Sequence, residues 1–301
     1  MRTQYRTLKT MLSDAPSPLS TKLKAQSNKA GFFRTLHQKG NPFVLANAWD
    51  IGTARTLAGI GAQALGTTSA GHAFTLGLAD MGNVRREEAI AHAAQLAAAT
   101  PLPISADLEN GYGHRPEDVA ETVRQATAAR LAGCSVEDTM LPDSAPYAFD
   151  DAVNRIAAAA QTARAATDDF VLTARADGIM NGHYDVDEAV RRLRAFAEVG
   201  ADVLYAPLLP TMETVKHLCD TLSAPINVLA TGTLATYRVT DFASIGVARI
   251  SLGGGLARVG HAAIVQSARS ILQDGDLSSL QNGADGDEID ALLKKGTDAQ
   301  N

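Results

Sequence analysis

The chain has 301 residues and a formal net charge of −6, with 46% hydrophobic and 20% charged residues. This composition is typical of globular proteins, and without a basic stripe we expect no nucleic-acid partner. No apolar run approaches the roughly 20 residues needed to span a bilayer, and the two cysteines, Cys134 and Cys219, give no disulfide framework. We therefore expect no membrane partner and a reducing, cytoplasmic location.

Residues 1–40 are predicted to form an extension that precedes the main domain. Residues 1–13 carry basic side chains and no acid, a bias found in targeting segments and also in plain polar termini. A hinge that contains proline and serine spans residues 14–20. Residues 21–38 then have helical spacing, which predicts a helix.

Beyond residue 41, short apolar segments alternate with Ala-rich segments of helical period. Pro116 is typical of a helix start, and Gly133 and Gly200 are typical of helix ends. The predicted strands are residues 43–49, 62–68, 103–109, 134–138, 170–175, 203–206, 226–230 and 248–252. The predicted helices are residues 52–59, 86–99, 116–132, 150–166, 186–199, 212–222, 239–245 and 256–272.

Eight such strand–helix units predict a (β/α)₈ TIM barrel, an α/β fold that forms a single catalytic domain over residues 41–275. The alternative is a doubly wound open sheet. That fold more often has five to seven strands and a Gly-rich fingerprint after the first strand, which this chain lacks. Residues 276–301 are predicted to be a polar C-terminal tail.

Two acids follow the third predicted strand at a spacing that points to a metal. In a strand, residues i and i+2 share a face, so Asp107 and Glu109 are expected to project together at the strand's carboxyl end. Neighbouring carboxylates repel each other unless a cation lies between them. The pair therefore indicates a divalent metal site.

The active sites of (β/α)₈ barrels lie where the strands end and the βα loops begin. At these ends the sequence has acids after strands two, three and four, and Arg175 after strand five. Carboxylates favour Mg²⁺ or Mn²⁺, and an arginine can bind a carboxylate or phosphonate in bidentate fashion. Tyr205, at the end of strand six, is a candidate acid or hydrogen-bond donor.

Five segments together resemble the isocitrate lyase/phosphoenolpyruvate mutase superfamily across residues 43–268. They are Val44–Asp50, the loop Thr67–Gly71, the strand end Asp107–Gly113, Val136–Asp138 and Ala174–Arg175. The resemblance implies an enzyme that forms or stabilises an enolate of a 2-oxo acid next to Mg²⁺. It also implies a homodimer or homotetramer in which the C-terminal helix is exchanged.

The resemblance assigns roles to single residues. It implies that Asp107 binds the metal directly, that Glu109 and Glu137 hold metal-bound waters, and that Arg175 binds the charged head of the substrate. Asp80, in the loop after strand two, matches a further acid of the family. The expected catalytic residues are Arg175, Asp80 and Glu137, and the expected substrate-binding residues are Trp49, Ser69, Ala70, Gly71, Arg175 and Asn227.

Two features depart from the family pattern. Glu109 stands where the family usually has Asp, and residues 139–147 contain none of the Cys, Lys or His of the lyase loop. We therefore predict a Mg²⁺-dependent lyase that acts on a small 2-oxo or 2-hydroxy dicarboxylate resembling oxaloacetate or methylisocitrate, by C–C cleavage or decarboxylation through a metal-stabilised enolate. The alternatives are C–P bond chemistry on phosphonopyruvate and a non-catalytic binding barrel.

Overall fold

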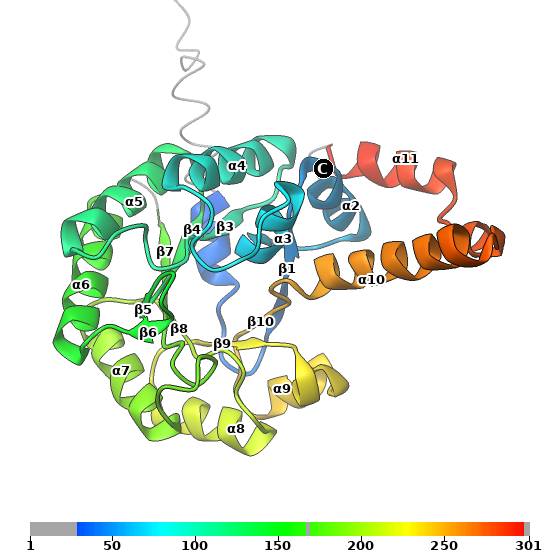
Figure 1. The fold of residues 1–301 in the computed structure, drawn as a ribbon. Coiled ribbons are helices and arrows are strands. Elements are labelled where there is room, and N and C mark those ends of the chain that lie inside the picture. The colour runs from blue at the N-terminus through cyan, green and yellow to red at the C-terminus, as the bar shows by residue number, and fades with distance from the viewer. Residues whose placement is uncertain (1–28, 167–168, 298–301) are drawn as a thin grey trace, which may run out of the picture.

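Eight parallel strands close into a barrel, which confirms the predicted (β/α)₈ architecture (Figure 1). The computed structural model describes residues 29–166 and 169–297. Around the barrel the strands follow the order β1-β10-β9-β8-β7-β4-β3-β2. Their bounds are β1 Phe43–Ala48, β2 Leu65–Thr67, β3 Ile104–Asp107, β4 Gly133–Glu137, β7 Val171–Arg175, β8 Val203–Tyr205, β9 Ile226–Leu229 and β10 Arg249–Ser251.

Helices surround the barrel, and several begin at side-chain caps. Asp50 and Asp185 each accept a hydrogen bond from a backbone N–H in the first turn of the helix that follows, which satisfies a group that has no partner within the helix. Each predicted barrel helix is present with small shifts at its ends. They are α2 Ile51–Ile60, α4 Arg86–Ala99, α5 Pro116–Ala128, α6 Phe149–Ala165, α7 Val186–Glu198, α8 Met212–Thr221, α9 Val239–Ser244 and α10 Gly255–Arg269.

The parallel register brings three polar strand ends to one level. Glu137 on β4 pairs with Arg175 on β7, and Arg175 pairs in turn with Tyr205 on β8. Side chains of paired residues on neighbouring strands point to the same side of the sheet. The register therefore places these three side chains next to one another at the carboxyl end of the barrel.

The opposite end of the barrel is closed by the chain before β1. Residues 29–35 are helical, which agrees with part of the helix expected over 21–38, while 21–28 lie outside the described residues. Phe33 and Phe43 are buried here and their rings meet edge to face. This apolar plug separates the barrel interior from solvent at its amino end.

Several short elements escaped the sequence analysis. A short helix, α3 (Ser69–Thr75), follows β2 directly, and strands β5 (Thr139–Met140) and β6 (Ala145–Pro146) form a small hairpin after β4. The segment predicted as a polar tail contains a further element, the helix α11 (Gly286–Lys295). The helix α3 and the hairpin are too short for hydrophobic periodicity to detect. α11 did carry a local signal that the sequence analysis missed, because Asp285 caps it and Ile289, Leu292 and Leu293 follow helical spacing.

The C-terminal part of the chain leaves the barrel and returns to it. α10 projects from the barrel wall, and Val259, Ile264 and Leu272 in and just after it are exposed (Figure 1). α11 then packs on α2, where Gly59 and Gly296 bring the two backbones closer than any Cβ atom would allow. No described helix is long and apolar enough to cross a membrane.

Candidate active site

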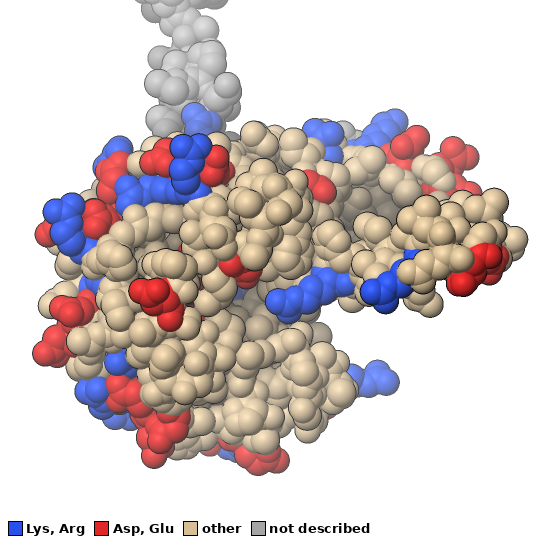
Figure 2. Space-filling view, in the orientation of Figure 1, with Lys and Arg blue, Asp and Glu red and all other residues tan. Residues whose placement is uncertain are grey.

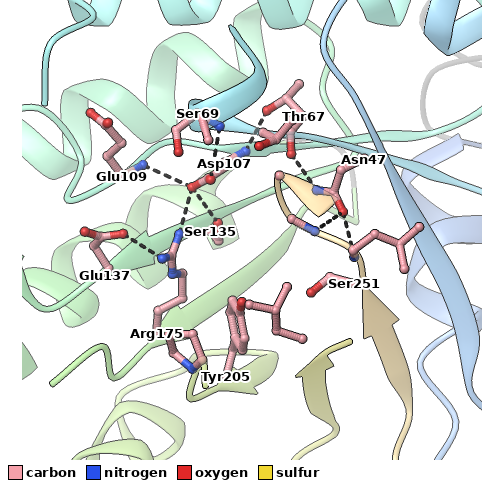
Figure 3. Close-up of a pocket in the computed structure, with 18 of the residues that line it drawn as sticks. Asn47, Thr67, Ser69, Asp107, Glu109, Ser135, Glu137, Arg175, Tyr205 and Ser251 are labelled. Carbon is pink, nitrogen blue, oxygen red and sulfur yellow. Dashed lines mark hydrogen bonds and ion pairs between the residues drawn. The ribbon is translucent and has the colours of Figure 1, made fainter. Parts of the chain in front are cut away.

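A cavity of about 190 Å³ opens at the carboxyl end of the barrel, where (β/α)₈ folds place their active sites. Figure 2 shows the recess on this face, beside the base of α10. The lining comes from nearly every strand end and is largely polar (Figure 3). Its polar residues include Asn47, Thr67, Ser69, Asp80, Asp107, Glu109, Ser135, Glu137, Arg175, Tyr205, Asn227, Arg249, Ser251 and Arg258.

Asp107 lies at the centre of the polar network. One of its carboxylate oxygens accepts from the Arg175 guanidinium at 2.9 Å, and the other accepts from the Ser69 backbone N–H at 3.3 Å. The Ser135 hydroxyl lies 3.5 Å away. The carboxylate is thus held in place by groups from three other segments of the chain, with 20% of its side chain exposed to the cavity.

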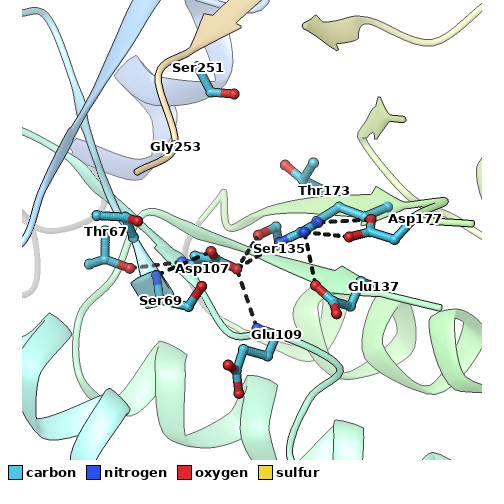
Figure 4. A network of polar contacts seen from close by, with 12 residues as sticks. Thr67, Ser69, Asp107, Glu109, Ser135, Glu137, Thr173, Asp177, Ser251 and Gly253 are labelled. Carbon is cyan, nitrogen blue, oxygen red and sulfur yellow. Dashed lines mark hydrogen bonds and ion pairs between the residues drawn. The ribbon is translucent and has the colours of Figure 1, made fainter. Parts of the chain in front are cut away.

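Arg175 bridges three carboxylates, those of Asp107, Glu137 and Asp177, which are labelled in Figure 4. Its guanidinium pairs with Asp107 at 2.9 Å, Glu137 at 2.9 Å and Asp177 at 2.5 Å. Burial disfavours its charge, but these acids outweigh burial and hold the pKa of Arg175 well above its ordinary value. The arginine is therefore a fixed cation, fully engaged by protein acids when no ligand is bound.

Glu109 reaches the cavity by a route that differs from the predicted one. β3 ends at Asp107, and the backbone of Glu109 is left-handed with φ +47°, so the two residues do not share a strand face. The turn nevertheless brings the Glu109 side chain to the cavity, where it accepts from the Gly82 N–H at 3.0 Å. A non-glycine residue in this backbone region is uncommon and is often found at functional sites.

The acids of the cavity outnumber its nearby cations. We call Asp80, Asp107, Glu109 and Glu137 the acid cluster. Burial, reinforced by the neighbouring carboxylates, raises the pKa of Glu109 to about 7 and also raises the pKa values of Asp80 and Glu137. Burial and mutual repulsion therefore disfavour the charged forms of these carboxyls, and a cation bound among them would favour those forms again.

The cluster has the donor chemistry of a magnesium site. Within residues 29–166 and 169–297, no three His, Cys, Asp or Glu side chains converge as a direct ligand cage. Mg²⁺ usually keeps several waters and takes only one or two carboxylates directly. Carboxylates spread around one polar cavity, with Asp107 central, fit an ion of that kind.

Other predicted site residues are divided between the cavity and its surroundings. Ser69 and Ala70 line the cavity, whereas Trp49 and Gly71 are not among the residues that line it. The Gly71 N–H donates to the Thr68 hydroxyl at 3.3 Å, as part of the α3 cap. The Trp49 carbonyl accepts from His92 at 2.8 Å, on the outer side of the βα loops.

Asn227 lines the cavity but its amide already has partners. The side-chain carbonyl accepts from Arg249 at 2.8 Å and the NH₂ donates to Ser251 at 2.9 Å. The sequence analysis overlooked Ser135 and Arg249. Strand alternation was the available signal, because Ser135 lies two residues before Glu137 and Arg249 two residues before Ser251.

Comparison with known proteins defines the class. Residues 33–272 match the family model described as phosphoenolpyruvate phosphomutase. The chain therefore belongs to the isocitrate lyase/phosphoenolpyruvate mutase superfamily, as the sequence motifs indicated. It is an enzyme of that superfamily.

Individual relatives cover most of the chain. An uncharacterised protein of Mycobacterium tuberculosis (strain ATCC 25618 / H37Rv) is 32% identical over 247 residues, which is 81% of this chain and 90% of the relative. The 2-methylisocitrate lyase of Shewanella oneidensis is 27% identical, over 75% and 80% of the two chains.

Solved structures give the same assignment. A Burkholderia cenocepacia J2315 protein described as a candidate lyase/mutase superposes with a TM-score of 0.84 at 41% identity, covering 89% of this chain and 96% of its own. Oxaloacetate acetylhydrolase in complex with the product oxalate has a TM-score of 0.79 at 25% identity, covering 88% and 94%.

Proposed function

We propose that this protein is a Mg²⁺-dependent lyase that acts on a small 2-oxo or 2-hydroxy dicarboxylate. The observation that carries the proposal is the acid cluster, which surrounds a polar cavity at the barrel mouth and faces a fixed arginine. A cavity of this size suits a small organic acid. Several relatives have names that refer to such acids, among them 2-methylisocitrate lyase and 2,3-dimethylmalate lyase.

The acid cluster would hold the ion, with Asp107 as its direct ligand and Glu109 and Glu137 bound to its water shell. Asp80 adds a fourth carboxylate from the loop after β2. When bound, Mg²⁺ supplies a Lewis acid that polarises the oxo group and takes up negative charge.

Arg175 would bind the substrate carboxylate, and this bond would replace some of its ion pairs with protein acids. Its Nη1 and Nη2 atoms face Asp107 and Glu137, which belong to the acid cluster. A cation that arrives between these carboxylates competes for them, which frees guanidinium donors for a substrate carboxylate. Bidentate binding of this kind orients a planar carboxylate.

The hairpin β5–β6 favours decarboxylation over Cys-dependent cleavage. Residues 139–147 provide no Cys, Lys or His to the cavity. Loss of CO₂ from an oxaloacetate-like acid requires electrophilic activation and a proton donor but no thiolate base. For the C–P alternative, no specific observation at this hairpin gives support.

We further propose that two or more copies associate through the C-terminal helices. The exposed apolar residues of α10 and the segment after it form a continuous stretch of the chain, and Leu277 and Leu280 extend it. A monomer rarely exposes so much apolar surface in one region. Gel filtration with light scattering measures the mass, and a monomer at micromolar concentration would contradict this proposal.

The main test combines binding with turnover. Mg²⁺ and oxalate together, each at about one hundred times its Kd, are expected to raise the free energy of unfolding, by about 2.7 kcal/mol for each such ligand. Oxaloacetate with Mg²⁺ should yield pyruvate above the rate of the metal alone. If neither effect appears, a non-catalytic barrel is the better description, and phosphorus NMR on phosphonopyruvate tests the C–P alternative.

A further inference from the structure

Opposite the acid cluster, four neighbouring side chains on β8, β9 and β10 form a group that we call the floor relay. Arg249 Nε donates to Asn227 Oδ1 at 2.8 Å, and Asn227 Nδ2 donates to Ser251 Oγ at 2.9 Å. Tyr205 lies next to Ser251, which acts on the pKa of its phenol. All four residues are buried and all line the cavity.

The relay has a defined direction. A guanidinium can only donate, so the Asn227 carbonyl faces Arg249 and its NH₂ faces Ser251. The Ser251 oxygen accepts that bond and has its own proton left to donate. Its contact with the Val228 carbonyl at 3.5 Å is at the limit of a hydrogen bond, so this proton is only weakly engaged.

The Tyr205 phenol lines the cavity, so its proton is within reach of a ligand bound there. Burial raises the pKa of Tyr205, and Ser251 lowers it by a smaller amount. Tyr205 is thus a neutral hydroxyl whose proton is available to a ligand.

Arg249 supplies the positive end of the relay. No ion pair among the described residues includes it, and its other donors go to Thr173 at 3.0 Å and His37 at 3.2 Å. Burial lowers its pKa to about 9, so it still carries its charge at neutral pH. A cation at one end of a hydrogen-bonded chain polarises every bond along it.

Tyr205 is also placed beside the proposed carboxylate clamp. It pairs in register with Arg175, whose guanidinium carbon lies 5.3 Å from the centre of the phenol ring. Figure 3 shows Tyr205 and Ser251 across the cavity from Asp107 and Glu109. A substrate gripped by Arg175 would lie between the acid cluster and the phenol.

We propose that Tyr205 donates the proton that completes the reaction, with Ser251, Asn227 and Arg249 as positioning residues. The inference rests on the proposed lyase function. In decarboxylation of oxaloacetate the C3–C4 bond breaks, CO₂ leaves, and the bonding electron pair remains with the substrate as the enolate of pyruvate. The enolate carbon takes the proton from the Tyr205 O–H, the C=O bond re-forms, and water reprotonates the phenolate after the product leaves.

The test uses Tyr205→Phe with oxaloacetate and Mg²⁺. Loss of a general acid is expected to lower kcat about a hundredfold or more, while KM changes less than about threefold. Tyr237→Phe is the matched control, because Tyr237 is exposed and lies outside the cavity lining. If Tyr205→Phe keeps more than half of the wild-type kcat, the assignment is wrong.

Stereochemistry separates a proton donor from a packing residue. Oxaloacetate made in situ from malate labelled stereospecifically with deuterium at C3 is turned over in tritiated water. The wild-type protein should give pyruvate with a chiral methyl group, and residual turnover by Tyr205→Phe should give a racemic one. A racemic product from the wild-type protein, or a chiral product from the variant, overturns the proposal.

The relay has its own readout. Ser251→Ala should lower kcat about tenfold with KM unchanged, and Ser251→Thr, which keeps a hydroxyl, should recover most of that loss. Equal kcat values for the Ala and Thr variants contradict the positioning role. Absence of pyruvate from the wild-type protein, together with no stabilisation by Mg²⁺ and oxalate, refutes the proposed function itself. Pyruvate formation with an unchanged kcat in Tyr205→Phe refutes the Tyr205 assignment alone.

Discussion

The two halves of the barrel mouth bury polar groups in opposite ways. The half built from β2, β3 and β4 concentrates acids whose pKa values are raised by burial and by one another, so their charged forms are disfavoured while no cation lies among them. The half built from β8, β9 and β10 contains neutral donors, with Arg249 as a cation that no protein acid pairs among the described residues. The first half is suited to attract a metal ion, and the second to present protons to an anion.

This difference indicates how one cavity can perform two tasks. A carboxylate that ligates a metal is a poor proton donor, because the ion stabilises its charged form. A phenol remote from the ion keeps its proton. Separation of the two chemistries on opposite walls, with Arg175 between them, lets both operate at one pH.

The largest effect is expected when Asp107, the central carboxylate on the β2–β4 side of the cavity, is replaced. Asp107→Asn is expected to lower kcat/KM for oxaloacetate about a thousandfold or more, because the direct metal ligand is lost. Titration of Mg²⁺ by calorimetry should show weakened binding in parallel.

The matched control for that variant is Asp187→Asn on the exposed first turn of α7. It should leave both turnover and Mg²⁺ binding near the wild-type values. Normal Mg²⁺ affinity in Asp107→Asn would place the metal elsewhere.

Replacement of Arg175 tests whether the buried carboxylates need a positive charge beside them for the fold to be stable. Arg175→Gln leaves Asp107, Glu137 and Asp177 without their shared partner. Breaking a buried ion pair by removal of one member typically costs about 3–5 kcal/mol, so the free energy of unfolding should fall by that order. Added Mg²⁺ should restore part of the loss, and denaturant titrations with and without Mg²⁺ measure both. Identical loss in the two conditions would argue against metal compensation.

The pH dependence of stability tests the charge of Arg249 on the β8–β10 side of the cavity. Burial, and then repulsion from Arg249, lowers the pKa of His37 to about 3, whereas an unfolded histidine titrates near 6.5. Between these values the unfolded chain binds more protons than the folded one. The free energy of unfolding is therefore expected to fall as the pH drops below 6.5, by about 2 kcal/mol at pH 5 from this group.

His37→Gln should flatten that dependence, since the variant has no titratable group beneath Arg249. Denaturant melts at pH 7 and pH 5 compare the slopes. His217→Gln, on the exposed face of α8, should keep the wild-type slope. Equal slopes for all three proteins would show that His37 does not titrate on unfolding.

The smallest effect on turnover is expected from substitutions away from the cavity, at glycines in α2 and α10. Gly59→Ala adds a methyl group where the Leu292 backbone leaves no room, and overpacking typically costs about 1–3 kcal/mol. Gly260→Ala in α10 meets no neighbouring atom and should be neutral or slightly stabilising. Turnover should be unchanged in both, as measured with the same oxaloacetate assay.

The barrel could be predicted because each strand–helix unit carries the same local signals. Apolar strands, Ala-rich helices and glycine ends recur along the chain, and the positions at strand ends then place Asp107, Glu137 and Arg175 near one another. The family motifs added detail that periodicity alone does not contain.

The remaining features depend on tertiary structure. The left-handed turn at Glu109 and the engagement of Arg175 by three acids arise from contacts between distant segments. The hydrogen bonds of Arg249 to Asn227 and Thr173 likewise join strands that are distant in the sequence. α11 is polar along most of its sequence, and its place is set by packing on α2, which no local pattern encodes.

The contact between α2 and α11 has a mechanical consequence. α10 is anchored at one end by β10 and, through the chain that follows it, at the other end by the first helix after β1. Both ends of α10 are therefore fixed to the barrel. An exchange of α10 between copies would first have to break the close backbone contacts at Gly59 and Gly296. The roughly 40 residues from α10 to α11 would then exchange as one unit.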